Sequence, residues 1–170
     1  MKNLHEDTIK SLSESMVNLG LVPLGVDETI SMMHFFEFFM HGTGHWLGLD
    51  VHDAGSTEVD GQPRQFKNGM VTTVEPGIYV RPTKPVIEFP LIERDPKKIR
   101  ERRKLLGMEK ATILEKEEIS NAKTIKHEIP KELLGVGVRI EDDIICTNDG
   151  PVNMTEKAPK TIEEIEAITS

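Results

Sequence analysis

The sequence predicts an α+β fold, with helical and strand segments along one chain. Apolar residues recur at helical spacing near the N-terminus, and runs rich in Val, Ile and Thr occupy residues 70–80 and 134–147. β-branched residues favour strands, whereas an apolar residue every three or four positions is typical of an amphipathic helix. The length of 170 residues fits one domain.

The first fifty residues contain two predicted helices and one predicted strand. Apolar residues at helical spacing predict an amphipathic helix over residues 5–19, and Gly20 is a suitable stop for it. A second, shorter helix rich in Met and Phe is predicted over residues 27–39, with its aromatic side chains in the core. In residues 45–52, aliphatic side chains at positions 47, 49 and 51 alternate with other residue types at positions 46, 48, 50 and 52, which predicts a strand.

The remaining regular elements lie in the second half of the chain. Residues 70–80 and 134–147 are predicted strands because they are rich in Val, Ile and Thr. Residues 148–151 read Asn-Asp-Gly-Pro, which is typical of a turn. A terminal helix is predicted to begin at Thr161, whose hydroxyl and the Glu164 carboxylate can form a capping box.

A long charged segment separates the two strand regions, from about residue 84 to 132. Residues 93–132 hold 12 of the 21 basic residues and 9 acidic ones, and helix-favouring residues dominate them. This composition predicts an exposed helical hairpin that packs by one face on the domain. Its apolar stripe would consist of Ile99, Leu106, Ile113 and Leu114.

The same segment carries a cluster of basic side chains that offers a surface for an anion or a partner. A solvated helix face is the simpler interpretation of such a cluster. Its members are Lys97, Lys98, Arg100, Arg102, Arg103 and Lys104.

Composition limits the classes of function. A formal net charge of −8 argues against nucleic acid as a partner. The single cysteine, Cys146, forms no internal disulfide and lies in an apolar strand where we expect it to be inert, so a cytoplasmic location is expected. No apolar stretch has the length of a membrane span, and the N-terminus lacks the apolar core of a secretory signal, so no membrane partner is expected.

Three histidines within twelve residues are the strongest functional signal. His41, His45 and His52 lie among glycines and apolar residues, and imidazole is the commonest metal-binding side chain and a proton carrier near neutral pH. Glu75 and Glu141 occur later in similarly apolar runs. A glutamate that ends a run of β-branched residues points into the fold or a cleft, where it needs a cation or a proton.

These residue types suit a divalent metal. Imidazole and carboxylate together favour Mn²⁺, Zn²⁺, Co²⁺ or Fe²⁺, and the motifs contain no thiolate for a softer ion. The alternative is that Glu75 and Glu141 are strand-end carboxylates paired with Arg81 or Arg139.

Three motifs in order resemble the catalytic domain of Xaa-Pro aminopeptidases (aminopeptidase P), metallopeptidases with the pita-bread fold. They are HGTGHWLGLDVHD at 41–53, GMVTTVEPGIYV at 69–80 and GVGVRIEDDI at 135–144. The resemblance covers most of residues 5–90 and 133–168. Prolidases and methionine aminopeptidases share the fold, but the string from Trp46 to Asp53 is more similar to aminopeptidase P. The whole chain then resembles the C-terminal part of a pita-bread (creatinase/aminopeptidase) domain with a charged helical insertion at about 84–132.

The resemblance implies roles for individual residues. Family members hold two metal ions through two aspartates, a histidine and two glutamates, and His45, Glu75 and Glu141 match the last three, with Mn²⁺ the expected metal. Glu141 would bridge the ions, and Glu75 would also act as a proton shuttle. His52 and His41 match histidines that contact the peptide and the tetrahedral intermediate. The catalytic set is completed by Arg139, a cation two residues before Glu141 on the same strand face.

The two aspartate ligands of the family have no match here. Asp50 and Asp53 correspond to family positions that are not ligands. The sequence therefore predicts an Xaa-Pro aminopeptidase-like fragment that acts on peptides with proline at the second position. The alternatives are an inactive pita-bread module for binding or oligomerisation, or one half of a split enzyme with a complementary N-terminal half; a prolidase-like dipeptidase is less favoured. A half-domain would expose apolar surface and strand edges, so a homo-oligomer is expected.

Overall fold

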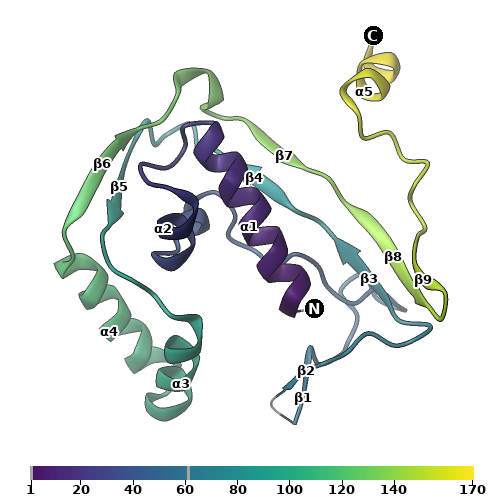
Figure 1. Ribbon diagram of the computed structural model, residues 1–170, viewed down its shortest axis with the longest axis horizontal. Coiled ribbons are helices and arrows are strands. Elements are labelled where there is room, and N and C mark those ends of the chain that lie inside the picture. Colours follow the sequence, from purple (N-terminus) through teal and green to yellow (C-terminus); the bar gives the residue numbers. More distant parts are fainter. Residues whose placement is uncertain (1, 61) are drawn as a thin grey trace. The chain divides into compact units, whose positions relative to one another are not determined.

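The computed structural model describes residues 2–60 and 62–170, which fall into two compact units (Figure 1). The first unit takes in the chain up to residue 8, residues 41–78 and residues 138–170. The second takes in residues 9–40 and 79–137. The chain passes from one unit to the other within α1, between Met40 and His41, within β4 and within β7; the bounds of these elements are given below.

The first unit is built on a three-stranded antiparallel sheet in the order β3-β8-β9. Val71 of β3 lies opposite Ile145 of β8, and Ile144 lies opposite Asn153 of β9. A two-stranded ribbon and a C-terminal helix complete the unit. The elements are β1 (Glu58–Val59), β2 (Gln62–Pro63), β3 (Val71–Val74), β8 (Asp142–Thr147), β9 (Gly150–Asn153) and α5 (Ile162–Thr169).

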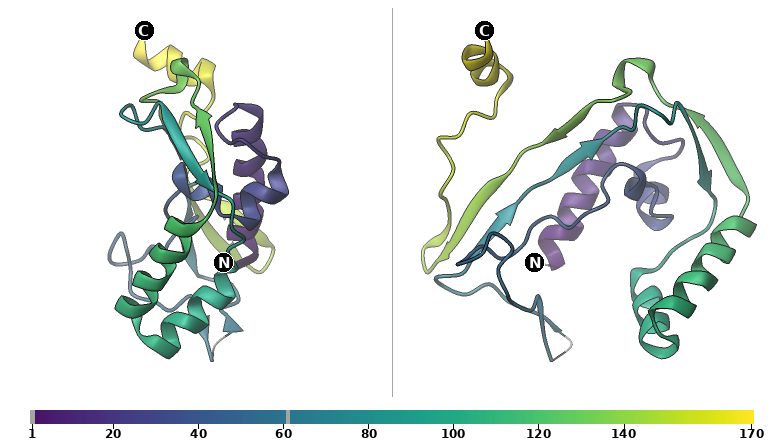
Figure 2. Two further views of the ribbon diagram at one scale, coloured as in Figure 1. Left: turned by 90° about the vertical axis from the view of Figure 1, so that its left-hand side faces the viewer. Right: turned by 180° about the vertical axis from the view of Figure 1, so that it is seen from behind.

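The second unit combines short helices with one long β-ribbon. In both figures β5 and β6 run side by side and lead into the helical hairpin α3–α4 (Figures 1 and 2). Most of α1 also belongs to this unit, and β4 (Gly77–Tyr79) and β7 (Gly137–Arg139) form a two-stranded sheet. The elements are α1 (Lys2–Asn18), α2 (Val26–Ser31), a 3₁₀ turn (His34–Glu37), β5 (Val86–Pro90), α3 (Pro96–Leu106), α4 (Met108–Asn121), β6 (Thr124–Glu128) and a 3₁₀ turn (Lys131–Leu133).

Aromatic side chains form the core of the second unit, as the sequence predicted. Phe38, Phe39 and Phe89 are almost completely buried, and Phe35 is buried as well. Burying a side chain of this size contributes about 1.5–3 kcal/mol relative to leaving it exposed. Phe36 is the exception, because half of it is exposed.

Two of the elements predicted in the first fifty residues are wrong. The helix predicted over 27–39 ends at Ser31, because Met33 adopts a left-handed backbone (φ 58°) that starts a separate 3₁₀ turn. The strand predicted over 45–52 is reduced to a single bridge between Trp46 and Thr72. Beyond that bridge the chain folds back on itself, and the amide of Asp53 donates to the Trp46 carbonyl.

The two long predicted strands lie where strands are found, but each of them is divided into two shorter strands. Residues 70–80 form β3 and β4 with a break at Glu75–Pro76, and residues 134–147 form β7 and β8 with a break at Ile140–Glu141. Both glutamates of interest therefore lie at breaks rather than within strands. The Thr161–Glu164 capping box is confirmed at α5. Among the described residues, no helix is both long and apolar enough to cross a membrane.

The charged segment of residues 84–132 contains the predicted helical hairpin, but strands β5 and β6 lie on either side of the hairpin and were not predicted. Asp95 caps α3 by accepting from the Lys97 amide. The buried face differs from the predicted stripe: Ile113 is 52% exposed, whereas Ala111 and Glu115 are buried. Glu115 is tolerated there because Arg103 binds it through two hydrogen bonds, of 3.2 and 2.8 Å.

We expect His34 to make the stability of the fold depend on pH. Its ring is buried, its Nε2 donates to the Pro90 carbonyl at 2.9 Å, and its Nδ1 has no partner within the described residues. Burial lowers the pKa of His34 below the ordinary 6.5, an effect that the hydrogen bond to Pro90 partly opposes. The unfolded chain then binds more protons than the folded one just below pH 6.5, so stability is full above that pH and falls as the pH decreases.

We therefore expect the difference in melting temperature between pH 7.5 and pH 5.5 to be smaller in His34→Gln than in the original chain. The glutamine amide can keep the bond to the Pro90 carbonyl without a titrating ring. Thermal unfolding followed by circular dichroism at both pH values is the measurement. An unchanged difference would assign the pH dependence to other groups.

Candidate metal centre

Glu75 is anchored by its own main chain at the end of β3. Its amide donates to the Thr43 carbonyl at 2.7 Å, and the following residue, Pro76, has no amide hydrogen to continue the ladder. The residue is only 7% exposed. Because the strand ends before Glu75, the buried carboxylate of this residue lies beside the histidine segment.

His45 is held against the same strand through Thr73. The Thr73 amide donates to the His45 carbonyl, and the His45 amide donates to the Thr73 hydroxyl oxygen, both at 3.0 Å. The Thr73 hydroxyl in turn donates to Oε1 of Glu75 at 2.8 Å. One threonine side chain therefore fixes the His45 backbone and the Glu75 carboxylate together.

The ring of His45 is oriented as a metal ligand requires. Its Nδ1 lies 3.0 Å from the Trp46 carbonyl oxygen. A carbonyl can only accept, so Nδ1 carries a hydrogen and Nε2 is the ring nitrogen that faces the other donors. This nitrogen lies 3.3 Å from Oε1 of Glu75.

Glu141 completes a group of three donors. It lies between β7 and β8, and single ligand atoms of His45, Glu75 and Glu141 all lie within 4.8 Å of one another. Asp50 and Asp53 do not belong to this group. One imidazole and two carboxylates suit a divalent ion of intermediate hardness, and three protein ligands leave positions open for water or substrate. The donor set therefore fits a divalent metal ion, the class of ligand that the sequence predicted.

Arg139 supplies the positive charge beside the donors. Its Nη1 lies 3.2 Å from Oε2 of Glu75, and its Nη2 lies 3.4 Å from Nε2 of His41. The pairing of Glu75 with an arginine, which the sequence left open, is thus present together with the donor group. Arg139 offsets the charge of a carboxylate that is nearly excluded from water.

The two other histidines of the motif surround the donors without joining them. His52 is exposed and stacks on the His45 ring, with centroids 4.0 Å apart and planes at 21°. Nδ1 of His41 lies 2.7 Å from the Gly42 carbonyl oxygen, so its Nε2 is the acceptor that faces Arg139. The sequence-predicted residues therefore meet in one place, all in the first unit.

His5 and Thr43 also lie at this site, although no sequence pattern singled out either residue. Nδ1 of His5 lies 2.8 Å from the Thr43 hydroxyl oxygen. Burial lowers the pKa of His5, Glu6 opposes this, and His41 lowers the pKa further. Within its predicted helix His5 is one polar residue among many, so no local pattern marks it.

Comparison with known proteins shows the family to which the chain belongs. The model of metallopeptidase family M24 matches residues 1–148, and the chain belongs to this family. The match includes all the residues of the candidate centre.

Named relatives agree with the family. The chain is 34% identical to the Xaa-Pro aminopeptidase of Escherichia coli over 95% of its own length, and 33% identical to that of Haemophilus influenzae over 98%. It spans only 27% and 28% of the lengths of these two relatives.

Solved structures confirm the predicted fold class. The chain superposes on the aminopeptidase PepP of Pseudomonas aeruginosa with a TM-score of 0.68 and 34% identity, covering 96% of this chain and 28% of that one. It also matches a zinc-substituted aminopeptidase P of Escherichia coli in complex with product, with a TM-score of 0.65 and 33% identity, covering 97% of this chain and 28% of that one. The architecture is therefore that of the pita-bread aminopeptidases over the part that the chain covers.

Proposed function

We propose that this chain supplies part of the metal centre of an Xaa-Pro aminopeptidase, which removes an N-terminal residue that precedes proline. The observation that carries the proposal is the convergence of one imidazole and two carboxylates within 4.8 Å, on segments from three distant parts of the sequence. Membership of family M24 and identity to named Xaa-Pro aminopeptidases support it.

Each residue of the centre has a role that its environment favours. His45, Glu75 and Glu141 would hold the divalent metal, with Mn²⁺ as the proposed ion and two ions in a complete site. A bound divalent ion lowers the pKa of a water ligand and polarises a carbonyl oxygen. Nδ1 of His45 is committed to the Trp46 carbonyl, which keeps Nε2 ready as a donor.

The remaining groups would act on the peptide. Glu75 is the proposed proton carrier, because Thr73 and Arg139 hold its two oxygens in fixed positions beside the donors. His41 and His52 would contact the substrate and the tetrahedral intermediate. Arg139 contacts both Glu75 and His41, so it would fix the position of the proton carrier relative to an imidazole on the substrate side.

The number of donors favours a second candidate, a chain that is inactive alone and acts as a binding module or as one half of a split enzyme. Three donors can hold one ion, whereas two ions bridged by a carboxylate need more. The first unit also has an apolar groove of about 520 Å³, whose lining includes Leu4, Phe66, Val74 and Ile144. A complementary N-terminal half, or a second copy of the chain, would cover such a surface.

A titration and an activity assay test the proposal together. When no complementary half supplies further metal donors, we expect the chain to bind about one Mn²⁺ weakly. We also expect it to cleave an Ala-Pro or Arg-Pro peptide poorly or not at all. Calorimetry should show that His45→Ala removes the binding, because the imidazole is one of the three donors that the described part of the chain brings together.

Two results would contradict parts of this proposal. Robust turnover by the chain alone, abolished by EDTA and by His45→Ala, would exclude an incomplete site. Mn²⁺ binding that is unchanged in His45→Ala would show that the donor group is not the metal site.

A further inference from the structure

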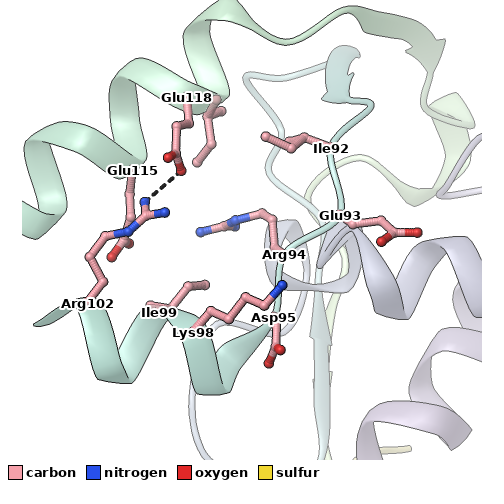
Figure 3. A pocket seen from close by; sticks show the side chains of 10 residues that line it. Ile92, Glu93, Arg94, Asp95, Lys98, Ile99, Arg102, Glu115 and Glu118 are labelled. Carbon is pink, nitrogen blue, oxygen red and sulfur yellow. Dashed lines mark hydrogen bonds and ion pairs between the residues drawn. The ribbon is translucent and has the colours of Figure 1, made fainter.

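The insertion contains a pocket that is separate from the metal centre. It lies where the segment after β5 meets the hairpin α3–α4, wholly within the second unit, and has a volume of about 90 Å³ (Figure 3). A water molecule occupies about 30 Å³ of the liquid, so the pocket exceeds the space of one water. Its apolar walls are Ile92, Ile99 and Ile119.

Two arginine side chains face one another across this pocket. In Figure 3 the guanidinium groups of Arg94 and Arg102 point toward each other, and Lys98 of α3 also lines the pocket. Within the described residues, the guanidinium of Arg94 forms no hydrogen bond or ion pair. It is partly buried, and its pKa is lowered mainly by that burial, with Glu115 opposing and Arg103 adding to the effect. Such a cation is destabilised until an anion accompanies it.

The nearby carboxylates are already engaged by other groups. Glu115 accepts both of its hydrogen bonds from Arg103, and Glu118 accepts from Arg102 at 2.7 Å. Asp95 caps α3, and the Glu93 side chain points away from the pocket in Figure 3. Among the residues that the structure describes, Arg94 and Lys98 are therefore left as cations without a carboxylate of their own.

We propose that this pocket binds a phosphate group, either as the free ion or as the terminal group of a phosphate ester. A tetrahedral oxyanion offers acceptor oxygens to Arg94, to the unshared edge of Arg102 and to Lys98, which all line the pocket. Phosphate near neutral pH carries about 1.5 to 2 negative charges, enough to compensate most of the charge of Arg94 and Lys98. A planar carboxylate carries one charge and two oxygens, so it would compensate only one of these two cations.

The test is phosphate titration of the metal-free chain in EDTA, by calorimetry at constant ionic strength set with chloride. Removing metal separates this pocket from the donor group, because phosphate can also bind a metal ion. We expect saturable 1:1 binding that weakens about tenfold or more in Arg94→Gln and in Lys98→Gln. The matched control is Lys104→Gln, which removes the same charge from an exposed position of α3 outside the pocket.

Further arms separate the possible ligands. Competition by phenyl phosphate would identify a terminal phosphate group as the ligand, and exclusion of phenyl phosphate would identify the free ion. Binding of acetate as tight as that of phosphate would overturn the proposal. Equal weakening in Lys104→Gln would also overturn it, because that result would mean a general charge effect. Circular dichroism of both pocket variants confirms that any loss of binding occurs in folded protein.

Discussion

Replacing Gly44 with alanine is expected to lower Mn²⁺ affinity by about tenfold or more. A β-carbon at this position would overlap the carbonyl oxygen of Thr73 and lie 2.8 Å from the carbonyl carbon. Both are main-chain atoms of β3, so the histidine segment must move away from the strand. The move breaks the paired bonds between His45 and Thr73, and overpacking of this kind costs about 1–3 kcal/mol.

Gly42→Ala is the matched control for this substitution. Its β-carbon would meet only the Gly44 carbonyl oxygen, at an ordinary contact distance of 3.7 Å. Each variant replaces one glycine by alanine, and the two positions lie only two residues apart. Their effects on the conformational entropy of the unfolded chain are therefore similar. Calorimetric Mn²⁺ titration, with circular dichroism to verify folding, should show loss for Gly44→Ala alone. Equal affinities in the two variants would mean that the close approach to Thr73 does not position His45.

The candidate site could be predicted because its chemistry is concentrated in short motifs. His41, His45 and His52 occur within twelve residues, and the glutamates end apolar runs that are typical of strands. The structure brings His45, Glu75 and Glu141 together as a donor group. Their roles as ligands stay a prediction until metal binding is measured.

Contacts between distant segments could not be predicted in the same way. Thr73 links the His45 backbone to the Glu75 carboxylate, and His5 reaches Thr43 from a residue 38 positions away. Local patterns of hydrophobicity carry no information about such partners, since a threonine in a strand has the same pattern wherever its hydroxyl points.

The errors in secondary structure have equally physical causes. Residues 45–52 alternate like a strand, but the chain folds back after Trp46, so that Leu49 and Val51 are exposed. In α4 the buried residues are Ala111 and Glu115, and no hydrophobic pattern marks the glutamate. Its burial depends on Arg103 in the preceding helix, so tertiary pairing overrides the local pattern.

Glu141 and His52 are expected to respond in different ways to substitution. Glu141→Gln should abolish Mn²⁺ binding, because the amide removes a charged donor from a group of only three. Glu163→Gln is the charge-matched control, since Glu163 is exposed in α5, outside the donor group. Calorimetric titration of the chain itself measures this arm.

His52→Ala should leave Mn²⁺ binding nearly intact, because the His52 ring stacks on His45 without belonging to the donor group. In a longer version of the protein that contains all the metal donors, the same change should lower kcat by about two to three decades. Loss of one contact to the transition state typically costs about 3–4 kcal/mol. Metal analysis beside steady-state kinetics on an Xaa-Pro peptide distinguishes the two roles. If His52→Ala loses metal as completely as Glu141→Gln, His52 is a ligand and its assignment to the substrate side is wrong.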